Sequence, residues 1–290
     1  MKPAAFAYEA PASLDDAVRA LGTEDAKVLA GGQSLVPILA LRLGRFGRLV
    51  DLRCIEELRI ITSENGSVRV GSMVRQADAE RDPQIRHGVP LLPMALQYVG
   101  HFQIRNLGTI GGSIAHADPA AELPAVALAL DATMEIAGPG GRRAVPAAEF
   151  FVSSYTTVLG DDEILSAVTF PRWPAGTGFA VEEIARRRGD FALVGAVCAV
   201  HVVDGVVERC AVSLFAVGPT PIRATDAEAI LKGQRIADIG PAVLSDVGSA
   251  AMAQANPATD VHASAEYRKH VGVNVVATAI ARALKESRNA

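Results

Sequence analysis

Two glycine-rich segments, far apart in the sequence, hold the residues whose types and spacing most suggest chemistry. The first reads V-L-A-G-G-Q-S-L over residues 28–35 and the second reads T-I-G-G-S over residues 109–113. Glycine has no Cβ, so the backbone can approach a phosphate closely, and the unpaired N–H groups where a helix begins attract an anion. Each segment therefore predicts an anion-binding backbone, and two of them suit a diphosphate.

The candidate phosphate-binding residues are Val28, Leu29, Ala30, Gly31, Gly32, Gln33, Ser34 and Leu35 in the first segment and Thr109, Ile110, Gly111, Gly112 and Ser113 in the second. Neither segment has the G-x-G-x-x-G spacing of the Rossmann motif or the Gly-Lys-Ser/Thr of a P-loop. A Gly-Gly pair between a strand and a helix is more often only a turn, and that alternative stays open for each segment taken alone.

Two carboxylates follow the second segment and could bind sugar hydroxyl groups. Asp118 precedes Pro119, and Glu122 comes four residues later. A dinucleotide needs such an acceptor for its ribose. The alternatives are a turn residue for Asp118 and a charge favourable to a helix N-terminus for Glu122. The residues alone support function and structural role about equally.

No catalytic group or metal site is apparent. His116 has no second His or Cys nearby, and no Ser or Cys nucleophile is paired with a base. The three cysteines, Cys54, Cys198 and Cys210, include no C-x-x-C pair. An iron–sulfur cluster needs four patterned thiolates, so any cluster must lie on a partner chain. The hard chemistry is therefore expected from a bound cofactor.

The composition narrows the class of protein. The chain has 290 residues, a formal net charge of -4 and a pI near 5.9, which argues against a nucleic-acid partner. Its start lacks the pattern of a secretory signal, and its longest nearly apolar stretch, 191–203, is too short to cross a bilayer. Scattered cysteines suit a reducing compartment. We expect a cytoplasmic protein of about two domains.

The elements that must position the glycine segments follow from apolar periodicity and turn signals. A helix capped by Ser13, a strand at 27–30, a helix at 34–43 and a strand at 49–52 form a βαβ-like unit. Asn65-Gly66 predicts a hairpin. Further expected elements are helices at 91–99 and 122–130, a loop from 100 to 119, a turn at 139–141, a strand at 163–170 and a linker at 171–178.

The region after the linker has a different pattern. Apolar runs at 179–185, 192–203 and 206–217 predict a three-stranded antiparallel sheet. Thr225 and Glu228 have the spacing of a capping box that opens a helix, and Ser264 is positioned to cap a long C-terminal helix.

The two glycine segments, with their surroundings, resemble the FAD motifs of the molybdenum hydroxylase flavoprotein family, the FAD-carrying medium subunits of xanthine oxidase and carbon monoxide dehydrogenase type. The resemblance continues through several further stretches and so spans nearly the whole chain. These stretches are Leu41-Arg42-Leu43, Val50-Asp51-Leu52-Arg53, Glu122-Leu123-Pro124, Gly189-Asp190-Phe191-Ala192 and Glu266-Tyr267-Arg268.

The resemblance implies an α+β fold and a division into domains. Residues 1–176 would form a two-lobed FAD-binding domain of the vanillyl-alcohol oxidase type, with lobes at about 1–55 and 56–176. Residues 177–290 would form a C-terminal domain with the three-stranded sheet and helices. By the same resemblance the glycine segments wrap the diphosphate of a non-covalent FAD, Glu122 takes the ribose with Asp118 as second candidate, and Leu165 lies near the isoalloxazine.

The resemblance also implies partners. A large subunit would carry a molybdenum-pterin cofactor and a small subunit [2Fe-2S] clusters, in a dimer of heterotrimers, and this chain would pass electrons from the clusters to an external acceptor. Some relatives place a Lys near the flavin, whereas this chain has Glu182 and Glu183 followed by three arginines at 186–188. Two other functions remain open, a non-redox nucleotide-binding scaffold and a stand-alone flavin oxidoreductase.

Overall fold

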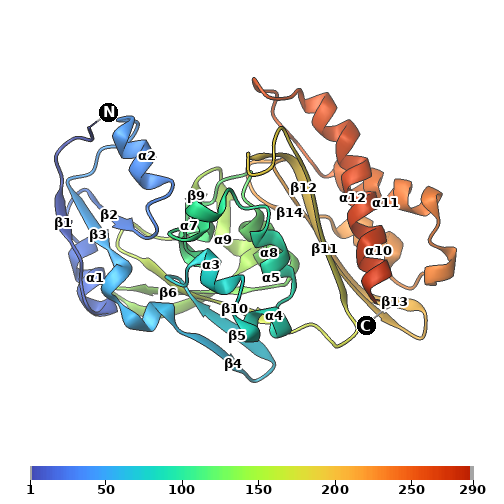
Figure 1. The fold of residues 1–290 in the computed structure, drawn as a ribbon, viewed down its shortest axis with the longest axis horizontal. Coiled ribbons are helices and arrows are strands. Elements are labelled where there is room, and N and C mark those ends of the chain that lie inside the picture. Colours follow the sequence, from blue (N-terminus) through green and yellow to red (C-terminus); the bar gives the residue numbers. More distant parts are fainter. Residues whose placement is uncertain (1, 288–290) are drawn as a thin grey trace.

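A computed structural model describes residues 2–287 as three successive blocks along the chain (Figure 1). An N-terminal lobe, blue in Figure 1, packs on a central block of mixed helices and strands, and a C-terminal sheet with three helices follows at the other end. The observed architecture confirms the predicted mixture of helices and strands, with segregated sheets rather than a single doubly wound one.

The N-terminal lobe is built on a small parallel sheet. Its strands lie in the order β1-β3-β2, and β2–α2–β3 is the βαβ unit that the sequence predicts. The Ser13 hydroxyl accepts a hydrogen bond from the Asp16 N–H and caps α1, whose apolar face packs on the sheet. The elements are β1 (Ala7–Glu9), α1 (Leu14–Leu21), β2 (Ala26–Leu29), α2 (Leu35–Ala40) and β3 (Arg48–Asp51).

The central block holds a five-stranded sheet in the order β4-β5-β10-β6-β7, covered by short helices. Asn65 and Gly66 both have positive φ and form the predicted hairpin turn between β4 and β5. The strands are β4 (Ile61–Glu64), β5 (Ser67–Gly71), β6 (Thr133–Gly138), β7 (Gly141–Pro146) and β10 (Ile164–Pro171), with the separate pair β8 (Phe151–Ser153) and β9 (Thr156–Thr157).

The helices of this block include five that the sequence did not predict, and two of these lie in an expected loop. The expected loop from 100 to 119 contains α6 and α7, so that prediction was wrong over much of its length. Both helices are short, and glycines 111 and 112 lower the intrinsic helix propensity of α7, which tertiary contacts override. The helices are α3 (Gln76–Ala79), α4 (Pro83–Gly88), α5 (Leu91–Leu96), α6 (Phe102–Arg105), α7 (Ile110–His116), α8 (Glu122–Ala129) and α9 (Ala147–Phe150).

The C-terminal block is a sheet of four strands, in the order β11-β12-β13-β14, where the sequence predicted three. The added β14 (Ile222–Arg223) has only two residues and follows Pro221, which is too little for an alternating pattern to reveal. The other strands are β11 (Gly178–Ala185), β12 (Ala192–Val203) and β13 (Val206–Phe215), and the helices are α10 (Thr225–Leu231), α11 (Pro241–Ala253) and α12 (Ala265–Ser287).

This C-terminal sheet is buried on both faces. Helices α10, α11 and α12 cover one face, and α5 and α8 of the central block lie against the other (Figure 1). Successive side chains of β11 point to the two opposite faces of the sheet. Phe179 and Val181 belong to the core shared with the central block, and Ala180 belongs to the core under α12. The boundary between the two blocks is therefore a continuous apolar core.

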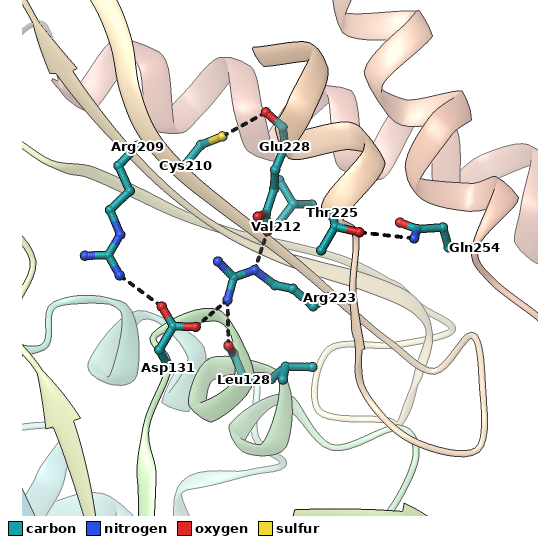
Figure 2. A network of polar contacts seen from close by, with 9 residues as sticks. All are labelled: Leu128, Asp131, Arg209, Cys210, Val212, Arg223, Thr225, Glu228 and Gln254. Carbon is teal, nitrogen blue, oxygen red and sulfur yellow. Dashed lines mark hydrogen bonds and ion pairs between the residues drawn. The ribbon is translucent and has the colours of Figure 1, made fainter. Parts of the chain in front are cut away.

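A polar network joins the blocks beside this core (Figure 2). Arg223 Nη1 donates to the Leu128 carbonyl at 3.0 Å and to Asp131 Oδ1 at 2.8 Å, at the C-terminal end of α8, while its Nε contacts Glu228. The Glu228 carboxylate also accepts from the Val212 N–H. The predicted capping box is therefore wrong, because Glu228 bonds to a strand and an arginine instead of the helix start.

Replacing Arg223 with methionine should lower the free energy of unfolding by about 1–3 kcal/mol, since Glu228 and Asp131 lose their shared partner. Chemical denaturation followed by fluorescence of Trp173, the single tryptophan, measures the change. Its ring stacks on Arg209, which also bonds Asp131. The control is Arg19→Met, which breaks an exposed pair within α1 and should cost less than about 0.5 kcal/mol. Equal effects of both changes would contradict a structural role for the network.

Candidate functional site

The two glycine segments meet in space. A Cβ built on Gly31 would lie 2.2 Å from the carbonyl oxygen of Leu107 and 2.8 Å from Cα of Gly108. A Cβ built on Gly112 would lie 3.2 Å from Cβ of Ala30. Both contacts are closer than ordinary van der Waals packing, so the backbones touch because glycine stands at these positions. The fold thus brings together the two segments that the sequence singled out.

The first segment leaves the carboxyl end of strand β2 in the parallel sheet. Gly32 has a φ of 71°, a conformation that a residue with a Cβ rarely adopts. The backbone N–H groups of residues 31 to 34 donate to no acceptor within the described part of the chain. Because buried or half-buried N–H groups normally find a partner, these four are available to an anionic ligand.

The second segment has a different character from the one predicted. Four of its five N–H groups are already bonded: those of Ile110 and Gly111 donate to the carbonyls of Val74 and Ser72, that of Gly112 to the Thr109 hydroxyl, and that of Ser113 to the Thr109 carbonyl. Thr109 is the N-cap of α7. The second segment therefore contributes glycines that let the two backbones approach closely, and most of the unbonded N–H groups lie on the first segment.

Two buried polar side chains lie under the second segment and were not identified from the sequence. Ser72 and Gln76 are 3% and 4% exposed, and neither Ser72 Oγ nor Gln76 Oε1 has a hydrogen-bond partner among the described residues. A Cβ on Gly111 would lie 2.3 Å from Cβ of Ser72, and one on Gly108 would lie 2.7 Å from Gln76 Oε1. Unpaired buried polar atoms are costly and often mark a ligand site.

Asp118 is held as a turn residue. Its carboxylate accepts from the Ala120 N–H at 2.9 Å and from the Tyr155 hydroxyl at 3.4 Å. The ring of His116 lies 5.1 Å from that of Tyr155, and burial lowers the pKa of His116. These bonds match the structural alternative for Asp118 and leave its carboxylate with fewer free lone pairs than that of Glu122.

Glu122 is the first residue of α8 and is 7% exposed. Its pKa is raised to about 8, chiefly by burial and also by the nearby carboxylates of Glu183 and Asp118, while a hydrogen bond from its own backbone N–H acts in the opposite direction. No arginine or lysine side chain within the described residues forms an ion pair with it. A buried carboxyl without a cation needs hydroxyl or N–H donors, which a ligand can supply.

Leu165 lies on β10, which pairs with β5, and Ser72 follows directly after the end of β5. Its side chain is 4% exposed and packs in the central core. The next residue, Ser166, accepts from the Ser72 N–H, and Ser72 in turn accepts from Gly111. Two backbone hydrogen bonds therefore connect Ser166, the neighbour of Leu165, to the second segment.

The arginines at 186–188 lie on the β11–β12 connection and are exposed. Arg188 borders an open hollow of about 490 Å³, whose other lining residues are Gln97, Gly100, His101, Phe102, Gln103 and Arg105. A Cβ on Gly189 would lie 2.6 Å from the His101 ring, so this connection packs against the start of α6.

Further observations concern the chemistry that the described residues could support. Cys198 and Cys210 are buried thiols, and the described residues contain no group of His, Cys, Asp and Glu able to hold a metal ion. Over residues 2–287, none of the helices combines the length and the apolar character needed to cross a membrane. The site offers groups for binding, and its described residues contain no nucleophile paired with a base.

Together these features describe a junction of two glycine segments whose unbonded N–H groups are suited to a phosphate-bearing ligand. The model of the FAD binding domain in molybdopterin dehydrogenase matches residues 4–173, and that of the CO dehydrogenase flavoprotein C-terminal domain matches residues 179–283. The chain belongs to this family of FAD-binding subunits of molybdopterin-dependent dehydrogenases.

Relatives extend over the full length of the chain. The 6-hydroxypseudooxynicotine dehydrogenase complex subunit alpha of Paenarthrobacter nicotinovorans is 38% identical, over 99% of this chain and 97% of its own length. The solved carbon monoxide dehydrogenase of Hydrogenophaga pseudoflava matches with a TM-score of 0.95 at 37% identity, over 99% of both chains. Quinoline 2-oxidoreductase of Pseudomonas putida 86 matches with 0.94 at 37%, again over 99% of both.

Proposed function

We propose that this chain is the FAD-carrying medium subunit of a heterotrimeric molybdenum hydroxylase. It accepts electrons from [2Fe-2S] clusters on a small subunit and passes them to an external acceptor, while a large subunit holds the molybdenum-pterin cofactor. The observation that carries the proposal is the junction of the two glycine segments, where an added Cβ on Gly31 would overlap the backbone at Leu107. The family of the chain makes FAD the ligand of that junction.

The residues at the junction fit an FAD that is bound without a covalent link. The free N–H groups of residues 31 to 34 suit its diphosphate, and Glu122 suits a sugar hydroxyl better than Asp118, whose carboxylate already accepts two hydrogen bonds. The proposed contacts comprise Val28 through Leu35, Thr109 through Ser113, Glu122 and the neighbourhood of Leu165. Residues 1–176 would be the FAD-binding domain, of the vanillyl-alcohol oxidase type, and residues 177–290 the C-terminal domain.

The chain contributes binding and orientation, and the flavin, when bound, supplies the ability to take up and release electrons. The glycine junction fixes the diphosphate end. Glu122 holds a hydroxyl group, and the apolar core around Leu165 excludes water beyond it. We assign no catalytic residue to the chain itself.

Exposed apolar side chains near the site suggest a surface to which a partner subunit binds. Phe102 is 64% exposed, Leu107 52% and Phe191 73%. All three lie on or beside α6 and the β11–β12 connection that packs against it. Such a cluster is unusual for a free surface, and we propose that the small [2Fe-2S] subunit covers it, within a dimer of heterotrimers in the cytoplasm.

Purified protein tests the proposal and separates the three functions left open by the sequence. Acid extraction of the complex should release stoichiometric FAD, and chemically reduced small subunit, added without oxygen, should bleach the flavin absorbance. A complex without extractable FAD would indicate the non-redox scaffold. Sustained turnover by the isolated chain with a soluble donor and acceptor would indicate the stand-alone oxidoreductase.

A further inference from the structure

Glu183 projects from the C-terminal block toward the central block. Side chains alternate along a strand, and on β11 Phe179 and Val181 pack into the core shared with α5 and α8. Glu183 is the next residue on the same face of β11 as Phe179 and Val181. Its neighbour Glu182, on the opposite face, pairs with Arg282 of α12. The face of the sheet that carries Glu183 is therefore the one that the central block covers.

The carboxylate of Glu183 has no ion-pair or hydrogen-bond partner in the part of the chain that the structure describes. Its Oε2 is buried and forms no hydrogen bond among the described residues. The cross-strand partner is Gly195, over which the Phe215 ring lies, since a Cβ on Gly195 would meet that ring at 2.0 Å. Glu183 thus stands at the edge of an aromatic core, where an unpaired carboxylate is costly.

Glu122 faces Glu183 across the domain boundary. Glu122 opens α8, which packs on β12 and β13, and the charge of Glu183 acts on its carboxyl. Asp118 acts on Glu122, and the neighbouring Tyr98 and His116 feel the charges of Glu182, Arg188, Arg282 and Lys27. Arg282 pairs with Glu182, and none of these cations forms an ion pair with Glu122 or Glu183 among the described residues. Arg209 and Arg223 are bound to Asp131 at the far end of α8.

We propose that Glu183 is a further cofactor-binding residue, supplied by the C-terminal domain, and that it and Glu122 together accept hydrogen bonds from hydroxyl groups of FAD. The inference rests on the proposed function. Hydroxyl groups donate without bringing charge, whereas phosphates would be repelled by two carboxylates. The site then has two parts, backbone donors on the first glycine segment for the diphosphate and a carboxylate pair for the sugar or polyol hydroxyls.

The protonation of the pair supports this assignment. Burial raises the pKa of Glu122 to about 8 and that of Glu183 to about 7. Donated hydroxyl groups favour the ionised carboxylate, so binding releases a proton and affinity rises with pH across this range. The buried Glu122 and the half-buried Glu183, neither of which forms an ion pair among the described residues, thus suit a ligand that donates hydrogen bonds.

Titration of deflavinated full-length protein with FAD, followed by flavin fluorescence, tests the role of Glu183. Glu183→Ala should weaken FAD binding by about 10- to 100-fold, the usual value of a hydrogen bond to a charged group. Glu183→Gln should weaken it less and flatten the rise of affinity between pH 6 and 9. The matched control is Glu182→Gln, on the opposite face of β11, which should stay within about threefold because it removes no ligand contact.

Riboflavin and ADP-ribose serve as separate probes of the two hydroxyl-bearing parts of FAD. Weaker riboflavin binding by Glu183→Ala places the contact on the ribityl chain, and weaker ADP-ribose binding places it on the ribose. FAD binding by Glu183→Ala within threefold of the parent protein overturns the inference and leaves the proposed function intact. A parent protein that binds no FAD overturns both.

Discussion

Gly31→Ala should leave the protein nearly free of flavin. The added methyl group would lie 2.2 Å from the Leu107 carbonyl and 2.8 Å from Gly108 Cα, and both obstacles are backbone atoms. The second segment must therefore move away from the first, which opens the junction and misplaces the free N–H groups of residues 31 to 34. We expect FAD affinity to fall at least about 100-fold, equivalent to roughly 3 kcal/mol.

The measurement is the FAD content of purified protein, with a titration of the deflavinated form. Gly140→Ala is the matched control, since a Cβ on Gly140 meets nothing within 4 Å. The fluorescence of Trp173, at the boundary of the central and C-terminal blocks, reports whether the rest of the fold survives. Normal FAD content in Gly31→Ala would show that the diphosphate binds elsewhere.

Glu122→Gln should have opposite effects on stability and on flavin binding. The pKa of Glu122 is raised to about 8 from its ordinary value of 4.5, so the folded protein favours the protonated carboxyl. This contribution to stability is complete below pH 4.5 and is lost as the pH rises through about 8. Without FAD, the parent protein should lose about 2–3 kcal/mol relative to Glu122→Gln between pH 6 and 9.

Urea denaturation of deflavinated protein at several pH values measures this difference. Glu149→Gln, which replaces an exposed carboxyl of the same block, should track the parent protein at every pH. The same Glu122→Gln protein should bind FAD about 10-fold more weakly, because an amide is a weaker acceptor than a carboxylate. If Glu122→Gln changes neither the stability nor the FAD affinity, Glu122 does not belong to the binding site. Greater stability together with weaker binding is typical of a residue that serves ligand binding at a cost to stability.

Much of the local structure could be predicted from short stretches of sequence. Ser13, the Asn65-Gly66 turn and the cap at Ser264 each act within a few residues of the backbone that they shape. Elements that depend on distant contacts were missed. Helix α7 exists because its first N–H groups bond Val74 and Ser72, and β14 because it pairs with β13.

The sequence by itself determined that two glycine-rich segments exist, that a carboxylate follows the second, and that no cluster ligands or catalytic pair accompany them. Glycine spacing and the absence of patterned cysteines are properties of the chain alone. Only the tertiary structure decided which groups of those segments are free. Gly31 and Gly112 look equivalent in sequence. The N–H of Gly112, however, donates a hydrogen bond to the Thr109 hydroxyl, whereas that of Gly31 has no partner among residues 2–287. Glu183 joins the site for the same reason, because its distance from Glu122 is set by how a sheet packs on a helix, which no local pattern encodes.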